Sequence, residues 1–428
     1  LYYQYMKLTV KLREQKMTGN IKKIQTGIQN SGIEDETAAV IEADSSWIKS
    51  KKYWYLTSMI LPGVPIFSAY LASQTGSGLW LWAMFVVLYA VLPLLDHISG
   101  LDAANPGEEL IAELKDDRYY VYVLYGAAIM HWAALIYMGY VVSIGDFSWF
   151  NVLGAGLSIG ISNGLGLVAG HEMGHKVNDK VQVFFAKLVL ACSGYGHFFI
   201  EHNKGHHKDV ATPEDPATSR FGESIYKFVK REVPGAFRRA WELESARLHR
   251  LGKSEWSLSN EIIQPALITI MAYMLMIAFF GPVMIPFLAL GAAYGWWQLT
   301  CANYIEHYGL MRERDANGRY ERCQARHSWN SNNKISNLVL LHLQRHSDHH
   351  AHPTRPYQML RDYPEVPALP SGYPWMFAVA MVPSAWFSTM NPMVTDWAEG
   401  DMSKVNIDPD VKDEMFKRYH KSKVTAAA

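Results

Sequence analysis

The chain has 428 residues, 49% of them hydrophobic and 13% aromatic, which is ample material for a large apolar core. Its 40 Lys and Arg residues balance 40 Asp and Glu residues, so no overall electric field draws it to nucleic acid. Three cysteines, Cys192, Cys301 and Cys323, are too few for a four-thiolate zinc site or an iron–sulfur cluster. A nucleic-acid binder and thiolate metal chemistry are therefore excluded.

Several long apolar stretches predict a membrane protein. The first two, residues 53–72 and 79–95, carry no formal charge, and each approaches the roughly 20 apolar residues that cross a bilayer. Similar stretches follow along the chain, and the longest is interrupted by glycine and proline at 281–286, where we divide it. The six predicted spans are residues 53–72, 79–95, 119–144, 150–169 and the two halves of 262–300.

The distribution of basic residues predicts which side of the membrane each segment faces. The short links 73–78, 145–149 and 281–286 contain no Lys or Arg, so by the positive-inside rule they lie on the outer side and both chain termini are cytoplasmic. Residues 181–200 are also apolar, but Lys187 stands in their middle, where a charge is costly in a bilayer. We therefore predict a re-entrant or interfacial helix there.

These patterns predict an all-α integral membrane protein, a six-helix transmembrane bundle with a cytoplasmic helical cap. We divide the chain into a polar N-terminal extension of unassigned role (1–46), the membrane domain with its cap (47–415) and a C-terminal tail (416–428). The lipid bilayer is thus an expected partner, and nucleic acid is not.

Histidines, 17 in all, gather in a few short motifs after residue 170. Residues 171–175 are HEMGH, 201–207 are EHNKGHH, 303–307 are NYIEH and 345–350 are RHSDHH. Spacings of three to five residues place at least two rings of a motif on one helical face. The nine candidate metal ligands are His171, His175, His202, His206, His207, His307, His346, His349 and His350.

Nine imidazoles exceed the roughly six ligands that a first-row ion accepts, so the count predicts two metals. Hydrolytic zinc needs three protein ligands and would leave six histidines unexplained, whereas two irons that reduce dioxygen would use all nine. Neutral ligands leave the metal charge uncompensated, so we expect carboxylates in an outer shell around the histidines. The candidates are Glu172, Glu201, Asp209, Asp215, Glu306 and Asp348.

Two readings from other classes remain open at this point. His171, Glu172 and His175 alone match the zinc protease signature, with Glu172 as the general base, which would make the chain an intramembrane zinc metalloprotease. A metal-binding or transport protein would instead carry polar residues within its spans, and apart from His131 almost none are present.

Taken together, these motifs resemble the histidine boxes of the membrane alkane 1-monooxygenases. The element NYIEHYG at 303–309 is the most specific, because it distinguishes that family from the fatty-acid desaturases, which share the other types of box. The resemblance extends from about residue 47 to about residue 415.

The resemblance implies a non-haem di-iron enzyme of the bacterial inner membrane, with its iron site cytoplasmic, acting in alkane degradation. It would use dioxygen to convert medium-length n-alkanes to primary 1-alcohols, with the nine histidines above as iron ligands and no further catalytic side chain. The two electrons would come from rubredoxin, with rubredoxin reductase upstream. Rubredoxin must be a separate chain, because it holds iron with four thiolates and this chain has three cysteines. The nearest rivals are a xylene-type methyl hydroxylase and a fatty-acyl desaturase with the same ligand set.

Overall fold

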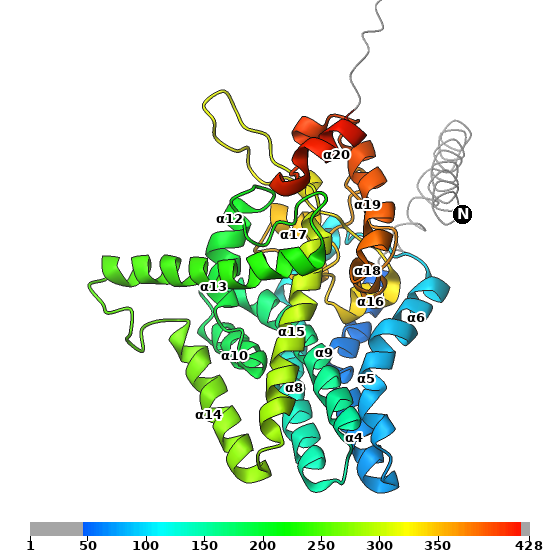
Figure 1. Ribbon diagram of the computed structural model, residues 1–428, viewed down its shortest axis with the longest axis vertical. Coiled ribbons are helices and arrows are strands. Elements are labelled where there is room, and N and C mark those ends of the chain that lie inside the picture. Colours follow the sequence, from blue (N-terminus) through cyan, green and yellow to red (C-terminus); the bar gives the residue numbers. More distant parts are fainter. Residues whose placement is uncertain (1–45, 421–428) are drawn as a thin grey trace, which may run out of the picture.

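The computed structural model describes residues 46–420, and within that range the chain is helical, without a named strand (Figure 1). Long helices lie side by side in one half of the molecule, and the long helix α13 (Ile225–Arg250), shorter helices and loops form a cap over one end of them. The long half contains α3 (Leu56–Ile60), α4 (Gly63–Thr75), η1 (Gly78–Trp82), α5 (Ala83–Val86), η2 (Val87–Val91), α6 (Leu92–Ser99), α8 (Tyr119–Ile144), α9 (Trp149–Gly174), α14 (Ile263–Phe280) and α15 (Met284–His307). The other main helices are α7 (Glu108–Asp116), α10 (Lys180–Leu190), α11 (Phe198–Ile200), η4 (Glu201–His206), α12 (His207–Asp209), α13 (Ile225–Arg250), α16 (Lys334–Val339), α17 (His346–Ala351), α18 (Tyr373–Ala380), α19 (Pro383–Trp397) and α20 (Lys412–Tyr419).

Four helical stretches in the described residues are long and apolar enough to cross a membrane. A fifth is added if Ser46–Ile60 and Gly63–Thr75, bent by 45° at their break, form one span. The helix α15 falls outside this set because two tryptophans, Tyr294 and Gln298 lower the hydropathy of its middle. The described residues therefore form an all-helical bundle with the length and composition of a membrane protein, whereas the six predicted spans stay a prediction. The four stretches are Gly78–Ser99, Tyr119–Ile144, Trp149–Gly174 and Ile263–Phe280.

The predicted N-terminal extension lies outside the described residues except for its last residue, Ser46. The chain beyond residue 420 is also outside them, and α20 ends just before that point. The division into extension, membrane domain and tail stays a prediction.

The apolar stretch 181–200 does not cross the bundle. Its first part forms α10, a helix of 11 residues that is too short to span a bilayer. The ammonium group of Lys187 donates to Gln264 Oε1 at 2.8 Å and lies 3.4 Å from a carboxylate oxygen of Glu261, at the start of α14. This arrangement agrees with the predicted interfacial or re-entrant helix, because the one charge in the stretch is paired rather than exposed to lipid.

Glycines spaced four residues apart allow α9 and α15 to pack closely. They lie on one face of α9, where an added Cβ would come within 2.7 Å of a side-chain atom of α15. In lipid, where apolar burial gives helices little reason to associate, such small residues permit the close contact that holds them together. The facing pairs are Gly156 with Leu290, Gly160 with Tyr294 and Gly164 with Gln298.

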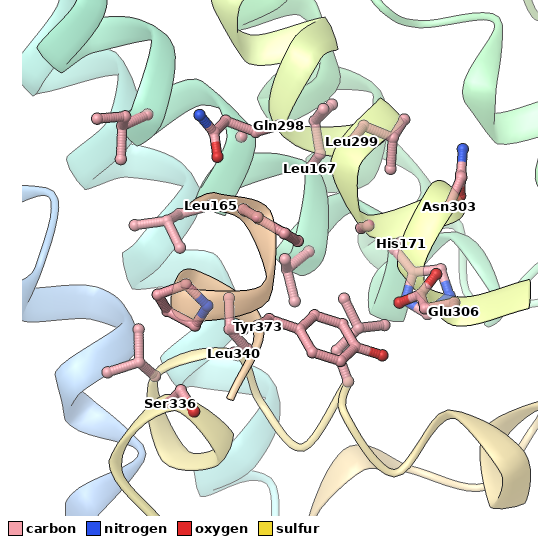
Figure 2. A pocket seen from close by; sticks show the side chains of 18 of the residues that line it. Leu165, Leu167, His171, Gln298, Leu299, Asn303, Glu306, Ser336, Leu340 and Tyr373 are labelled. Atoms are coloured by element: carbon pink, nitrogen blue, oxygen red, sulfur yellow. The ribbon is translucent and has the colours of Figure 1, made fainter. Parts of the chain in front are cut away.

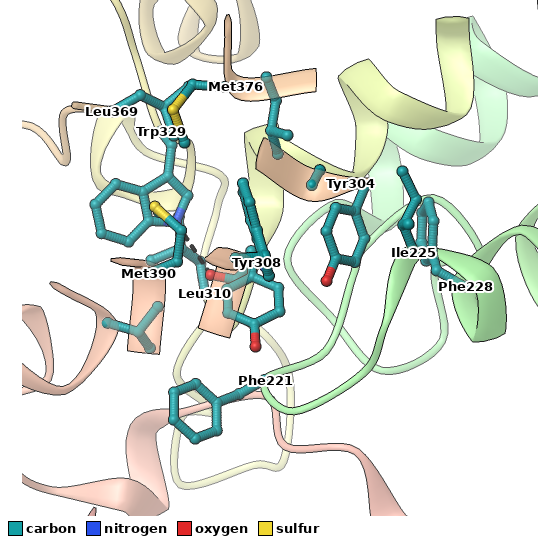
Figure 3. Close-up of a cluster of buried hydrophobic side chains, with 14 of the residues drawn as sticks. Phe221, Ile225, Phe228, Tyr304, Tyr308, Leu310, Trp329, Leu369, Met376 and Met390 are labelled. Carbon is teal, nitrogen blue, oxygen red and sulfur yellow. Dashed lines mark hydrogen bonds between the residues drawn. The ribbon is translucent and has the colours of Figure 1, made fainter. Parts of the chain in front are cut away.

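A buried aromatic cluster in the cap fixes the end of α15 (Figure 3). The ring of Tyr304 lies 5.0 Å from Trp386 and 5.6 Å from Tyr308, measured between centroids. Trp329 adds two hydrogen bonds to the same turn: its indole N–H donates to the carbonyl of Tyr308 at 3.0 Å, and its backbone N–H donates to that of Glu306 at 2.8 Å. The last turn of α15 is therefore held on several sides.

The glycine contact between α9 and α15 predicts a large effect of a small substitution. In Gly160→Ala the new Cβ would lie 2.5 Å from Tyr294 Cβ, an atom that cannot move without its backbone. We expect a loss of about 1–3 kcal/mol of stability from this overpacking, measured by thermal unfolding in detergent. The control is Gly63→Ala, whose Cβ would meet only Met130 Cε, at 3.9 Å. Equal melting temperatures for the two variants would contradict the close packing.

Candidate metal centre

Nine histidine side chains from four separate parts of the chain converge at the junction of bundle and cap. They are the nine that the spacing predicted, and they form two groups. Within each group the candidate ligand atoms all lie within 4.8 Å of one another. The first group is His171, His175, His202, His207 and His349, and the second is His206, His307, His346 and His350.

The second motif follows a π-helical turn, η4, rather than a regular α-helix. In an α-helix, residues five apart would point about 140° away from each other. In the wider turn the Nε2 atoms of His202 and His207 are 3.0 Å apart, and both rings join the first group, while His206 joins the second. A regular helix would instead place His202 and His206 on one face. The π turn, a feature common at functional sites, thus distributes one motif between both groups.

The last motif also serves both groups. From α17, His349 joins the first group, and His346 and His350, one helical turn apart, join the second. Just before this helix, Leu341 and His342 have φ angles of 51° and 57°, a left-handed backbone that side chains other than glycine disfavour. Such strain persists only where the surroundings fix it, so the placement of α17 is strongly determined.

Distances between the rings fit a shared ion. The Nε2 atom of His171 is 2.9 Å from that of His349 and 3.1 Å from that of His175. In the second group, the Nε2 atoms of His346 and His350 are 2.9 Å apart. Nitrogen ligands about 2.1 Å from one ion, at right angles, would be about 3.0 Å apart. A neutral imidazole presents either a lone pair or an N–H at Nε2, so hydrogen bonds can join inward-facing rings only in pairs, whereas one ion can accept the lone pairs of all the rings in a group.

Burial keeps most of these rings in the neutral form that binds metal. Burial first, and then the neighbouring histidines, lower the pKa values of His202, His207, His349 and His350. The rings are therefore neutral at pH 7 and have their lone pairs available, since metal competes with protons for imidazole nitrogen.

Asp215 supports the second group from behind. Its Oδ2 accepts from His206 Nδ1 at 2.9 Å, and its Oδ1 accepts from Arg239 at 2.7 Å. Arg239 also pairs with Glu201 and lies 3.6 Å from Asp209. Although burial opposes ionisation, His206 and Arg239 hold the pKa of Asp215 far below its usual range. The carboxylate orients the His206 ring and offsets positive charge, as outer partners of metal-bound histidines do.

The last turn of α15 faces the second group directly. Glu306 Oε2 lies 3.3 Å from His346 Nε2, and the same nitrogen lies 3.3 Å from His307 Nε2. On the other side of its ring, His307 Nδ1 donates to the backbone carbonyl of His327 at 3.2 Å. Glu306 is therefore aimed at the inward-facing nitrogen atoms, whereas the carbonyl of His327 sets the ring orientation.

Glu172 and Asp348, also predicted as supporting carboxylates, hold neighbouring loops instead. Glu172 accepts from the backbone N–H of Tyr357 at 3.3 Å and lies 3.8 Å from Lys176 Nζ. Asp348 accepts two hydrogen bonds from Arg355, at 2.5 and 2.6 Å. Each thus fixes a segment next to the histidines rather than an imidazole of the nine.

Sequence reasoning missed Arg239 and the role of the His327 backbone. Arg239 lies on α13, 24 residues beyond Asp215, and no local spacing connects it to the histidine motifs. A backbone carbonyl carries no sequence signal at all. The one available signal was that several carboxylates near the histidines would need a shared cationic partner if they were buried, and Arg239 is that partner.

An apolar cavity ends at the two groups (Figure 2). Along α9 its lining runs from His171 to Ile161, about 15 Å of helix at 1.5 Å per residue. Along α15 it runs from Glu306 to Gln298. The other walls come from η2, α6, α16 and α18 and are mostly leucine, valine and phenylalanine. The site thus joins metal-binding groups to a narrow, water-poor space.

Asp215 provides a test of the outer shell. In Asp215→Asn, His206 loses its anionic partner and Arg239 loses one of its carboxylates, so we expect metal affinity to fall about 10- to 100-fold. Metal content would be measured after dialysis against a graded series of chelator concentrations. The matched control is Asp209→Asn, which changes a more exposed partner of the same arginine. If both variants keep metal as the unmodified protein does, Asp215 does not support the site.

Comparison with known proteins agrees with these features. Residues 147–380 match the family described as "Fatty acid desaturase". The chain is 54% identical over 382 residues to the alkane 1-monooxygenase of Pseudomonas putida, covering 89% of this chain and 95% of that protein. It is 51% identical to the alkane 1-monooxygenase of Ectopseudomonas oleovorans, covering 92% and 99%. The xylene/toluene monooxygenase hydroxylase component of Pseudomonas putida is 28% identical over 238 residues, 54% of this chain and 61% of that protein. The chain belongs to the alkane 1-monooxygenase family.

Proposed function

We propose that this protein hydroxylates the terminal methyl group of medium-length n-alkanes, using dioxygen and two electrons to form primary 1-alcohols. The observation that carries the proposal is the junction of an apolar cavity with two groups of inward-facing imidazoles. The apolar space suits a hydrocarbon, and the imidazoles suit metals that activate dioxygen.

Two non-haem irons are the cofactors that best fit this donor set. Each group offers no more ligands than the roughly six that one ion accepts, with five imidazoles in the first and four in the second. Zinc hydrolases use three protein ligands and an open position, fewer than either group offers. Bound to these nine histidines, iron supplies the dioxygen and one-electron chemistry that no side chain has.

The protein's own residues position the alkane and exclude water from the site. An alkane has no polar group to be recognised, so the shape of the cavity must place its end. His171, His202 and His346 line the cavity, which brings a methyl group that reaches its end against the ligand rings. Apolar walls exclude water there, and a fixed approach lowers the entropic part of the barrier.

We infer a cytoplasmic orientation of the site in a bacterial inner membrane, with six spans and both termini cytoplasmic. The links 73–78, 145–149 and 281–286 lack basic residues, whereas the cap carries many, as the positive-inside rule requires. In this division residues 47–415 form the hydroxylase domain. An alkane partitions into lipid, so a membrane-embedded cavity meets its substrate there.

Rubredoxin, as a separate chain reduced by its reductase, is the proposed electron donor. In the cap, Arg220, Lys230 and Arg238 border an open groove that also contains one acidic residue, Glu214. Arg231 also lines it but is paired with Glu223 at 2.8 Å. A basic groove favours an acidic electron carrier.

The rival functions fit less well. A xylene-type methyl hydroxylase and a desaturase would use the same ligands, and product analysis separates them. An intramembrane zinc protease would need Glu172 free as a general base beside His171 and His175. Glu172 instead accepts from the backbone of Tyr357, and the first group contains five histidines rather than the two of that motif.

Turnover and metal content together test the proposal. Purified protein supplied with iron, rubredoxin, its reductase and octane should form 1-octanol and contain about two irons per chain. His207→Ala removes a ligand of the first group and should lower turnover at least 100-fold, in line with the loss of a metal-holding residue. His97→Ala changes an exposed histidine and should leave both measurements unchanged.

Other products identify the alternatives. An alkene would indicate a desaturase, and oxidation restricted to aromatic methyl groups would indicate a xylene-type enzyme. One zinc per chain without iron would contradict the whole assignment.

A further inference from the structure

Glu306 lies among the inward-facing nitrogen atoms of the second group. Its Oε2 atom is 3.3 Å from His346 Nε2, the same distance that separates this nitrogen from His307 Nε2. Two ligands at right angles, each about 2.1 Å from one ion, would lie about 3.0 Å apart. The carboxylate oxygen is therefore spaced from His346 as a neighbouring metal ligand would be.

No basic side chain neutralises this carboxylate. Glu306 is only 2% exposed, and no Lys or Arg within residues 46–420 pairs with it. Its Oε1 atom is buried without a hydrogen-bond partner. The phenol of Tyr373, which also lines the cavity, is a neighbour without charge. An ionised carboxylate is costly to bury unless a positive charge compensates it.

Other carboxylates beside the histidines have basic partners. These pairs hold loops or support a ring from behind, and none of these carboxylates needs a metal to balance its charge. Glu306 differs from them in both its partners and its position, so the positive charge that suits it is that of an ion held by the second group. The pairs are Glu201 with Arg239, Asp215 with Arg239, Asp348 with Arg355 and Glu172 with Lys176.

We propose that Glu306 binds the ion of the second group directly, as a ligand rather than as one of the outer carboxylates expected from the sequence. This inference rests on the proposed two-metal centre and adds one donor to it. The carboxylate brings the second group to five donors, the number of imidazoles in the first. Carboxylate oxygen together with imidazole nitrogen is a donor set that suits non-haem iron.

The carboxylate would make the two ions unlike. The first group offers five imidazoles, which bind a metal through a lone pair and bring no charge, whereas Glu306 brings a negative charge to the second. A negative donor stabilises the higher charge of an ion, so the second iron should be harder to reduce than the first. Glu306 also lines the cavity, and Figure 2 shows it at the same end as His171. The anionic ligand is thus on the side from which the alkane arrives.

Infrared spectroscopy tests the contact directly, because a carboxylate that binds a metal changes its stretching frequencies. Metal-free full-length protein in detergent would be titrated with Co²⁺, and difference spectra would be recorded. The unmodified protein should show a shifted carboxylate band, and Glu306→Gln should lose it. The matched control is Glu232→Gln, which changes a buried carboxylate that accepts from Thr300 and Asn303 of the same helix and should keep the band. A spectrum of the unmodified protein without any carboxylate change would overturn the proposal.

Metal affinity tests the charge. In the same titration, followed by the visible absorption of Co²⁺, Glu306→Gln should bind one ion as the unmodified protein does and the other at least about tenfold more weakly. Glu306→Asp keeps the charge on a shorter side chain and should recover part of that loss. Glutamine has the shape of a neutral glutamate, so unchanged affinity for both ions in Glu306→Gln would show a hydrogen-bonding role alone and overturn the proposal. Equal weakening of both ions would overturn it too, because it would indicate a general structural effect.

The proposed function and this ligand can fail separately. If the purified protein forms no alcohol from octane but its carboxylate band appears and is lost in Glu306→Gln, the proposed function fails and the ligand stands. If the protein forms 1-octanol while Glu306→Gln binds both ions with unchanged affinity, the ligand fails and the proposed function stands.

Discussion

The convergence of nine imidazoles on two small volumes is the constraint on which the rest of the structure depends. Inward-facing nitrogen atoms about 3 Å apart can hydrogen-bond only in pairs, whereas a cation can accept the lone pairs of a whole group. Every device around them serves that convergence: the π turn that divides the second motif, the strained backbone before α17, and Arg239, which gathers the carboxylates behind His206. Each is unfavourable or costly alone, and each is explained by the demand for a preformed metal centre.

The two helices α9 and α15 connect that centre to the cavity. One carries His171 near its end and the small residues Gly160 and Gly164 further along, while the other carries Gln298 and then His307. Their close contact therefore fixes the ligand end together with the cavity walls that the two helices supply.

Much of this could be predicted from sequence, for identifiable physical reasons. Membrane helices can be predicted from unbroken apolar stretches, and ligands such as His346 and His350 can be predicted from their helical spacing. Both signals are local in the sequence. The assignment of His202 and His206 to different groups could not be predicted, since it depends on one widened turn. Arg239 was also hidden, because its partners are brought to it only by the packing of α13 against the histidine segments. The residues that can act as ligands can be predicted from the sequence. Their division between the two groups, and the side chains that support them, depend on tertiary structure.

The element NYIEHYG shows why a motif can be more specific than its metal ligand. Besides His307, its residues build the joint that holds the ring: Tyr304 donates to the carbonyl of Glu223 at 2.6 Å, and Tyr308 packs in the aromatic cluster. Gly309 follows with φ of 74°, where an added Cβ would lie 2.9 Å from a methyl group of Val394. Asn303 donates to Glu232, whose pKa burial raises to about 7. The motif therefore specifies how the end of α15 is anchored, and that anchoring aims Glu306 and His307 at the second group.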